Sequence, residues 1–163
     1  MIEVRVAHLG LDRDNNSPVV VLQEKDGERV LPIWIGPAEA SAIAMELAGV
    51  KFARPLTHDL LKQIIVGLGA ELRRVNISSV KDNTYFAELL INRADHMFQV
   101  DARPSDSIAI ALRLKAPIFV DATLLDGTAT GMSRKAEAAP LDSEALKSYL
   151  QNLDPEDFGR FTP

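Results

Sequence analysis

The chain has 163 residues, of which 47% are hydrophobic and 25% are charged, and its formal net charge at pH 7 is -5. This length and composition predict one compact domain with a real core, and the acidic balance argues against a strongly basic nucleic-acid binder. Cysteine is absent, which excludes disulfides and cysteine-based zinc sites. No apolar run reaches the roughly 18 residues of a membrane helix, and the alternating N-terminus is unlike a signal peptide, so we expect a cytoplasmic protein without membrane contact.

Runs of alternating or β-branched apolar residues predict a protein rich in strands. The predicted strands are residues 2–6, 19–22, 30–35, 70–80, 84–92, 96–100 and 117–120. Asp26-Gly27 predicts a tight hairpin turn in which both residues have positive φ. Residues 81–84, KDNT, are expected to form another turn, between the fourth and fifth of these strands.

Three helices are predicted between the strands. The first begins at Pro37, because proline lacks the N–H that would be unpaired there, and ends near Gly49. The second begins at Thr57, its expected N-cap, and the third covers residues 106–115 with Ser105 as its N-cap.

The third helix is apolar on every face except at Ser107 and Arg113, so we expect it to be enclosed by other elements. Strands come both in hairpins and in strand–helix units. The predicted fold class is therefore α+β, with mixed or antiparallel sheets packed against buried helices.

The composition changes after Asp121. We expect a domain over residues 1–125, followed at 126–163 by a Gly- and Ala-rich linker, an amphipathic helix and a loose tail. Exposed strand edges and the detached C-terminal helix make a homodimer a plausible expectation.

A short repeat links two of the helix starts. Residues 39–47 (EASAIAMEL) and 106–114 (DSIAIALRL) align without gaps, and Arg-Pro precedes a helix start at both 54–55 and 103–104. A duplicated strand–turn–helix unit explains this pattern, and chance similarity between helices rich in Ala and Ile is the alternative.

Polar residues gather at the three helix starts. They are Glu39, then Arg54, Thr57, His58 and Asp59, then Asp101, Arg103, Ser105 and Asp106. If the helix starts converge, carboxylates and histidine there could bind Mg²⁺ or Mn²⁺, and arginine could grip phosphate. The competing interpretation is that these residues only cap helices and form structural ion pairs.

Other polar and aromatic residues give weaker signals. His8 and His96 lie at predicted strand ends without a paired ligand and are expected to be structural or solvated. Trp34 is expected in the core or at a partly buried surface rather than as a base-stacking platform.

Three blocks of the sequence carry a family resemblance. They are LPIWIGPAEASAIAMEL, RPLTHDLL and DARPSDSIAIALRLKAPIFV. In this order and spacing they resemble the bifunctional nuclease domain family, and the resemblance to its bacterial single-domain members covers roughly Met1 to Leu125. It implies an α+β fold with an internal duplication and a hydrolase that cleaves both RNA and DNA.

For residues within the matching blocks, we hypothesise roles from their chemistry. Asp101, Asp106 and Glu39 would hold a divalent ion, Mg²⁺ or Mn²⁺. The catalytic residues would be His58, Asp59, Asp101 and Asp106, with His58 as general base or acid. The substrate-binding residues would be Arg54, Arg103 and Ser105.

Three functions remain open from the sequence. The first is a metal-assisted nuclease that acts on RNA and DNA with little sequence specificity. The second is a non-enzymatic module that binds a small anionic ligand or nucleotide at helix N-termini. The third is an interaction or scaffold protein in which the polar residues have only structural roles.

Overall fold

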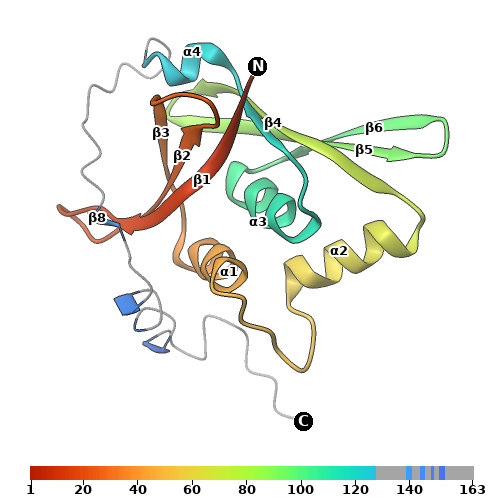
Figure 1. The fold of residues 1–163 in the computed structure, drawn as a ribbon, viewed down its shortest axis with the longest axis horizontal. Helices are drawn as coiled ribbons and strands as arrows, with labels where there is room; N and C mark the ends of the chain where they lie inside the picture. Colours follow the sequence, from red (N-terminus) through yellow and green to blue (C-terminus); the bar gives the residue numbers. More distant parts are fainter. Residues whose placement is uncertain (128–138, 141–143, 146–147, 149–150, 153–163) are drawn as a thin grey trace.

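The computed structural model describes residues 1–127, 139–140, 144–145, 148 and 151–152 (Figure 1). The elements in chain order are β1 (Ile2–Leu11), β2 (Pro18–Glu24), β3 (Val30–Trp34), α1 (Pro37–Leu47), α2 (Thr57–Gly67), β4 (Glu71–Lys81), β5 (Thr84–Arg93), β6 (His96–Ala102), α3 (Pro104–Leu114), β7 (Ile118–Val120), α4 (Ala122–Leu125) and β8 (Ala139–Pro140). Among the described residues, no helix is long and apolar enough to cross a membrane.

The strands form one mixed sheet in the order β3-β2-β1-β7-β4-β5-β6, with β8 paired to β1. Neighbouring strands are antiparallel except β4 and β7, which are parallel. This mixed sheet with its helices confirms the predicted α+β class. Three strands followed by a helix occur twice, as β1–β3 with α1 and as β4–β6 with α3, on either side of β7. A duplication would produce this symmetry, but common descent of the two units stays a prediction.

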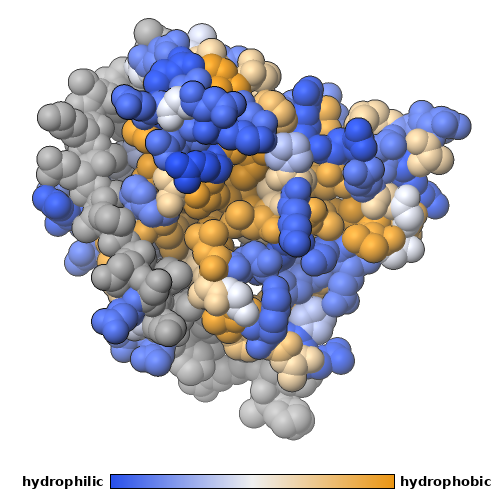
Figure 2. All heavy atoms as spheres, viewed as in Figure 1, coloured by the Kyte–Doolittle hydropathy of each residue, from blue (hydrophilic) through white to orange (hydrophobic). Residues whose placement is uncertain are grey.

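Helix α3 lies at the centre of the core, as its apolar sequence predicts. It contacts α1, α2, β4 and β5 (Figure 1). Ile108, Ala109 and Ile110 are completely buried because neighbours cover α3 on several sides. Figure 2 shows hydrophobic side chains gathered over the middle of the displayed face, bordered by hydrophilic ones.

The start of α3 differs from the prediction. Pro104 is the first residue of the helix and Arg103 is its N-cap, with extended backbone at φ -71° and ψ 146°. Ser105 therefore lies inside the first turn and is not the N-cap. The reason is that proline, with its fixed φ and no N–H, suits the first helical position.

One of the two predicted turns is wrong. Neither Asp26 nor Gly27 is among the residues with positive φ, and the chain instead makes a longer loop in which the Glu24 N–H donates to the Arg29 carbonyl at 2.9 Å. Two hydrogen bonds from the Arg29 guanidinium to the Glu24 carboxylate, at 2.9 and 3.0 Å, support this loop. The turn between β4 and β5 is confirmed.

Part of the C-terminal segment reaches the sheet. In β8, Ala139 and Pro140 pair with Leu11 and Gly10 at the end of β1. The predicted linker and C-terminal helix otherwise lie largely outside the described residues, so the division at residue 125 stays a prediction.

Candidate functional site

The starts of α1 and α3 meet at the exposed side chain of Arg103. Arg103 Nη1 lies 2.7 Å from Glu39 Oε1, and Arg103 Nε lies 2.8 Å from Asp106 Oδ2. Glu39 and Asp106 occupy equivalent positions in the sequence repeat. Arg103 therefore bridges the carboxylates of Glu39 and Asp106, which lie in the first turns of α1 and α3.

Helix α2 adds His58 to this cluster. His58 Nε2 lies 3.0 Å from Asp106 Oδ1, across a sequence separation of 48 residues. The His58 side chain is only 14% exposed and that of Asp106 is 31% exposed. All three predicted helix starts therefore converge, and Asp106 stands between a histidine and an arginine.

The charges around Asp106 fix its protonation. Burial alone would raise the pKa of Asp106, but hydrogen bonds from Arg103 and His58 outweigh burial and hold that pKa below its ordinary value. An ionised Asp106 accepts hydrogen bonds and donates none, so His58 Nε2 carries the hydrogen. Nδ1 of a neutral His58 then carries no hydrogen, so it can act as a proton acceptor.

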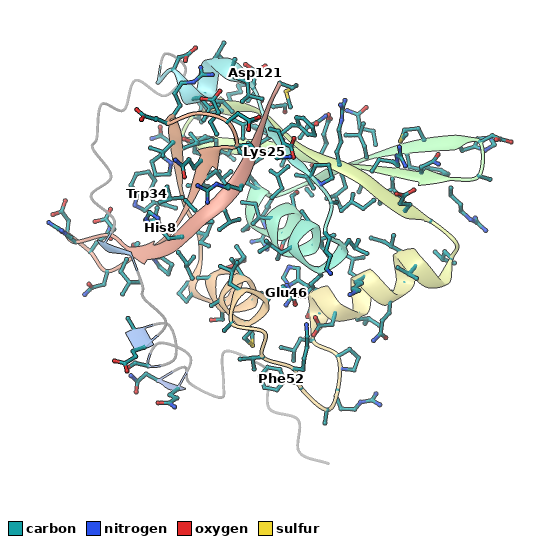
Figure 3. All side chains as sticks on the ribbon, viewed as in Figure 1. His8, Lys25, Trp34, Glu46, Phe52 and Asp121 are labelled. Carbon is teal, nitrogen blue, oxygen red and sulfur yellow. The ribbon has the colours of Figure 1, made fainter. Side chains whose placement is uncertain are left out.

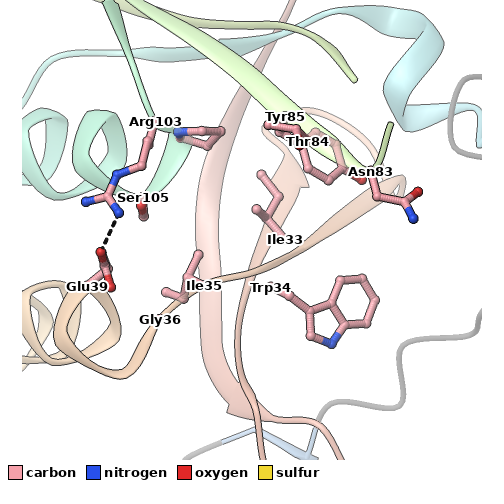
Figure 4. Close-up of a pocket in the computed structure, with 11 residues that line it drawn as sticks. Ile33, Trp34, Ile35, Gly36, Glu39, Asn83, Thr84, Tyr85, Arg103 and Ser105 are labelled. Carbon is pink, nitrogen blue, oxygen red and sulfur yellow. Dashed lines mark ion pairs between the residues drawn. The ribbon is translucent and has the colours of Figure 1, made fainter. Parts of the chain in front are cut away.

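Two pockets open on either side of the Arg103–Glu39 ion pair. The His58 pocket, of about 440 Å³, is lined by residues that include Glu39, Met45, Leu56, His58, Arg103 and Asp106. The Trp34 pocket, of about 310 Å³, is lined by residues that include Trp34, Glu39, Asn83, Tyr85, Arg103 and Ser105 (Figure 4). The ion pair is thus a wall common to both pockets.

Asp59 lies at the start of α2 but makes structural contacts. Its Oδ1 accepts a 2.7 Å hydrogen bond from Nε of the buried Arg113, and its Oδ2 accepts one from the Leu56 N–H at 3.1 Å. Leu56, rather than Thr57, is the N-cap of α2. Burial would raise the pKa of Asp59, but the Arg113 and Leu56 hydrogen bonds lower it overall. This geometry favours a structural role over the predicted catalytic one.

Asp101 is not brought into the cluster. It pairs in register with Glu88 on β5, where the residues on either side of Glu88 are buried, so Glu88 and Asp101 share the opposite face of the sheet. A carboxylate on that face is separated by the sheet from Glu39 and Asp106. In the part of the chain that the structure describes, no three His, Cys, Asp or Glu residues are grouped to hold a metal ion.

Arg54 and Ser105, the other predicted substrate-binding residues, have different positions. Arg54 is exposed in the segment before α2 and lines neither of the two pockets. Ser105 is 7% exposed and lines the Trp34 pocket beside the Arg103–Glu39 ion pair (Figure 4).

Trp34 belongs to the site region, although its sequence context suggests a core or surface residue. It is half-buried at the end of β3 and lies beside the first three strands, on the same side of the molecule as His8 (Figure 3). The signal in the sequence is its place two residues before the Gly36-Pro37 helix start. Tyr85 and Asn83 reach the same pocket from the β4–β5 hairpin, which no local pattern predicts.

The lowered pKa of Asp59 makes stability dependent on pH. Because the pKa of Asp59 is lower in the folded state, the folded protein binds fewer protons at Asp59 than the unfolded chain does. The ionised Asp59 therefore contributes to the free energy of unfolding above the ordinary aspartate pKa, and this contribution is lost as the pH falls through the pKa of the folded state. We therefore expect the free energy of unfolding to decrease less between about pH 5 and pH 2 in Asp59→Asn than in wild type. Urea unfolding across this range measures the effect, and an unchanged slope in Asp59→Asn would contradict it.

Comparisons with known proteins show which family the chain resembles. The family profile described as bifunctional nuclease domain matches residues 20–133. An uncharacterized protein of Mycobacterium tuberculosis is 41% identical over 169 residues, covering 97% of this chain and 98% of that protein.

Plant relatives carry the family's name. Bifunctional nuclease 2 of Oryza sativa subsp. japonica is 35% identical over 84% of this chain, which is 44% of that protein. Bifunctional nuclease 1 of Arabidopsis thaliana is 32% identical over 64% of this chain, which is 33% of that protein. The profile match extends across all three converging helix starts and both pockets, and the chain therefore belongs to the bifunctional nuclease domain family.

Proposed function

We propose that this chain hydrolyses phosphodiester bonds in RNA and DNA with little sequence specificity. The observation that carries the proposal is the hydrogen-bonded series from His58 through Asp106 to Arg103, at the wall of a pocket of about 440 Å³. It joins a histidine that can accept and donate a proton, a carboxylate that orients it, and a cation suited to phosphate. The names of the plant relatives support the same reaction class.

His58 is the proposed acid–base group. Water must be the nucleophile if one mechanism serves both substrates, because DNA lacks the 2′-hydroxyl. His58 Nδ1 takes a proton from the water as its oxygen attacks phosphorus. The bond from phosphorus to one sugar oxygen then breaks, and the departing oxygen takes a proton from solvent. Asp106 keeps the imidazole in the required tautomer and stabilises its positive charge.

Arg103 is the proposed phosphate ligand. Its side chain is 65% exposed, and a guanidinium has five N–H donors. In this proposal Arg103 Nε keeps its hydrogen bond to Asp106, while a phosphate oxygen replaces Glu39 as the partner of Arg103 Nη1. Bidentate contact with phosphate oxygens would stabilise the negative charge that develops during the attack.

A divalent ion held by Glu39, Asp101 and Asp106 does not fit this geometry, since Asp101 lies on the opposite face of the sheet. We assign no step to such an ion. Two carboxylates nevertheless face one arginine here, so an approaching phosphate meets excess negative charge. Activation by Mg²⁺ or Mn²⁺ therefore stays a prediction.

The matched pair Asp106→Asn and Asp101→Asn tests the proposal. Asp106→Asn removes the charge that orients His58, so we expect the rate of cleavage to fall by about a hundredfold or more. Asp101→Asn makes the same chemical change on the other face of the sheet and should leave the rate within about twofold of wild type. Both variants and wild type, purified identically, are incubated with end-labelled RNA and DNA in Mg²⁺, Mn²⁺ or EDTA.

Each other result has a definite meaning. Equal cleavage by wild type and Asp106→Asn would indicate a contaminating nuclease or a different site. Loss of cleavage in Asp101→Asn but not in Asp106→Asn would contradict both the role of Asp106 and the predicted metal set, which includes Asp106. Cleavage that EDTA leaves unchanged would contradict the predicted dependence on Mg²⁺ or Mn²⁺.

A module that binds an anionic ligand or nucleotide without cleaving it is the second candidate. It is favoured by the N-termini of α1 and α3, neither of which has a side-chain cap and whose first-turn residues Glu39 and Asp106 line the His58 pocket. Binding of a labelled oligonucleotide without product after prolonged incubation would select this function over the nuclease.

The predicted homodimer is a separate proposal. Strand β6 is an edge of the sheet, and it exposes Met97, Phe98 and Val100. An exposed apolar edge strand can pair with a second copy. Sedimentation equilibrium would measure the mass, and a monomer at all concentrations would contradict the dimer.

A further inference from the structure

We propose that the Trp34 pocket is a subsite for one unpaired nucleobase next to the scissile phosphate, so that the substrate is single-stranded nucleic acid. This inference rests on the proposed nuclease function and deepens it by naming the form of the substrate. Its volume of about 310 Å³ lies at the lower end of the roughly 300–1,000 Å³ typical of small-molecule sites. A pocket of this size suits one nucleoside unit rather than a duplex.

Charge in the Trp34 pocket is confined to one end. Figure 4 shows Arg103 and Glu39 together at that end, with Trp34 and Asn83 at the other. The lining between the two ends, including Ile33 and Tyr85, is uncharged. A ligand that matches this distribution has an anionic group at one end and a neutral, partly apolar group at the other. A nucleotide has this form, because its phosphate is charged and its base is flat and neutral.

Trp34 can provide a fixed stacking surface. Its indole Nε1 donates a 2.8 Å hydrogen bond to Asp12 Oδ2, which restricts rotation of the ring. The residue is only half-buried, so part of the ring remains accessible. Stacking on such a ring accepts any base, since every base has a π face. This agrees with the low sequence specificity of the proposed activity.

Two polar side chains in the wall have unused hydrogen-bonding capacity. Within the described residues, the Ser105 hydroxyl and the Asn83 amide make no hydrogen bond, although Ser105 is only 7% exposed. Asn83 has φ 59°, because it lies in the tight β4–β5 turn, and this turn holds it over the pocket end near Trp34. An amide both donates and accepts, so it can pair with the edge of any base. Ser105 lies where the sugar or phosphate would be.

The Arg103–Glu39 pair connects this subsite to the reaction. Both residues line both pockets, so a phosphate on Arg103 lies between Trp34 and His58. A base attached to that phosphate by one sugar can turn into the Trp34 pocket. A base paired in a duplex is stacked between its neighbours and is not free to do so. Cleavage should therefore favour single strands.

Trp34 itself reports on occupancy, because it is the one tryptophan of the sequence. Its fluorescence is titrated with adenosine 5′-monophosphate and, separately, with ribose 5-phosphate. We expect saturable quenching by the nucleotide and little change with the sugar phosphate, although both offer a phosphate to Arg103. An equal response to both ligands, or no response to either, would overturn the base subsite.

Variants test the subsite by a second route. Trp34→Leu should raise KM for single-stranded oligonucleotide about tenfold, the effect expected from loss of one stacked base, with a much smaller change in kcat. Asn83→Gly removes the amide while keeping the positive φ of the turn, and should raise KM as well. Phe52→Leu is the matched control, since Phe52 is 52% exposed between α1 and α2 and lines neither pocket. Thermal unfolding confirms that each variant is folded.

The outcomes separate this inference from the proposed function. Cleavage that depends on His58 but is the same in Trp34→Leu, and equal on single and double strands, would overturn the subsite and leave the nuclease in place. Quenching by the nucleotide in a protein that cleaves nothing would support the subsite and contradict the nuclease.

Discussion

Replacing His58 by alanine is expected to lower the rate of RNA and DNA cleavage by about a hundredfold to ten-thousandfold, the usual contribution of a general acid–base group. His58 joins α2 to the carboxylate at the start of α3, through the 3.0 Å contact with Asp106. Alanine removes the proton acceptor but leaves Arg103 paired with Asp106. Binding of substrate should therefore change much less than kcat.

The matched control for His58→Ala is His96→Ala. His96 is exposed at the beginning of β6 and lines neither of the two pockets, so its removal should leave cleavage unchanged. Single-turnover rates for both variants, measured with labelled single-stranded substrate, make the comparison. Wild-type rates in His58→Ala would exclude the proposed acid–base role.

Replacing Arg113 by methionine is expected to lower the free energy of unfolding by about 3 kcal/mol, as for other buried ion pairs that lose one partner. The Arg113 side chain is 4% exposed and donates to Asp59 at 2.7 Å and to the Ala42 carbonyl at 3.1 Å. It thus ties α3 to both α1 and α2. Methionine fills similar space but leaves the carboxylate and the carbonyl without their donor.

Urea unfolding of Arg113→Met is compared with that of Arg73→Met. Arg73 also forms an ion pair, with Glu71 at 3.1 Å, but the two side chains are 55% and 65% exposed. Exposed pairs of this kind contribute about 0–1 kcal/mol, so Arg73→Met should be almost neutral. Similar losses in the two variants would contradict the special role of Arg113. Because α1, α2 and α3 carry the candidate site, Arg113→Met should also weaken cleavage through its geometry.

The predicted elements were largely confirmed because their signals are local. Runs of alternating or β-branched apolar residues identified the strands from β1 to β7, and Pro37 marked the start of α1 as expected. The errors lie where two local rules compete. At the start of α3, Pro104 occupies the first helical position, so the serine that follows it cannot be the N-cap. At Asp26-Gly27, the Glu24–Arg29 contacts outweigh the preference for a two-residue turn.

The sequence predicted most residues of the candidate site but not their positions relative to one another. The sequence singled out Glu39, His58, Arg103 and Asp106, and the structure brings these four together. Asp101 is also a carboxylate close to the start of a helix, as Glu39 and Asp106 are. The alternation of side chains along β6 nevertheless places it on the other face of the sheet, which the sequence reading did not take into account.

The sequence by itself determined the α+β class, the three polar helix starts and the family, because these depend on patterns within short segments and on their order. Only the tertiary structure decided which carboxylate accepts the hydrogen bond from His58, which arginine is buried and which residues line the Trp34 pocket. These contacts join residues that are as many as 71 positions apart, as between Arg113 and Ala42. Such pairing depends on how α1, α2 and α3 pack inside the curved sheet, and packing is a property of the whole chain rather than of any local pattern.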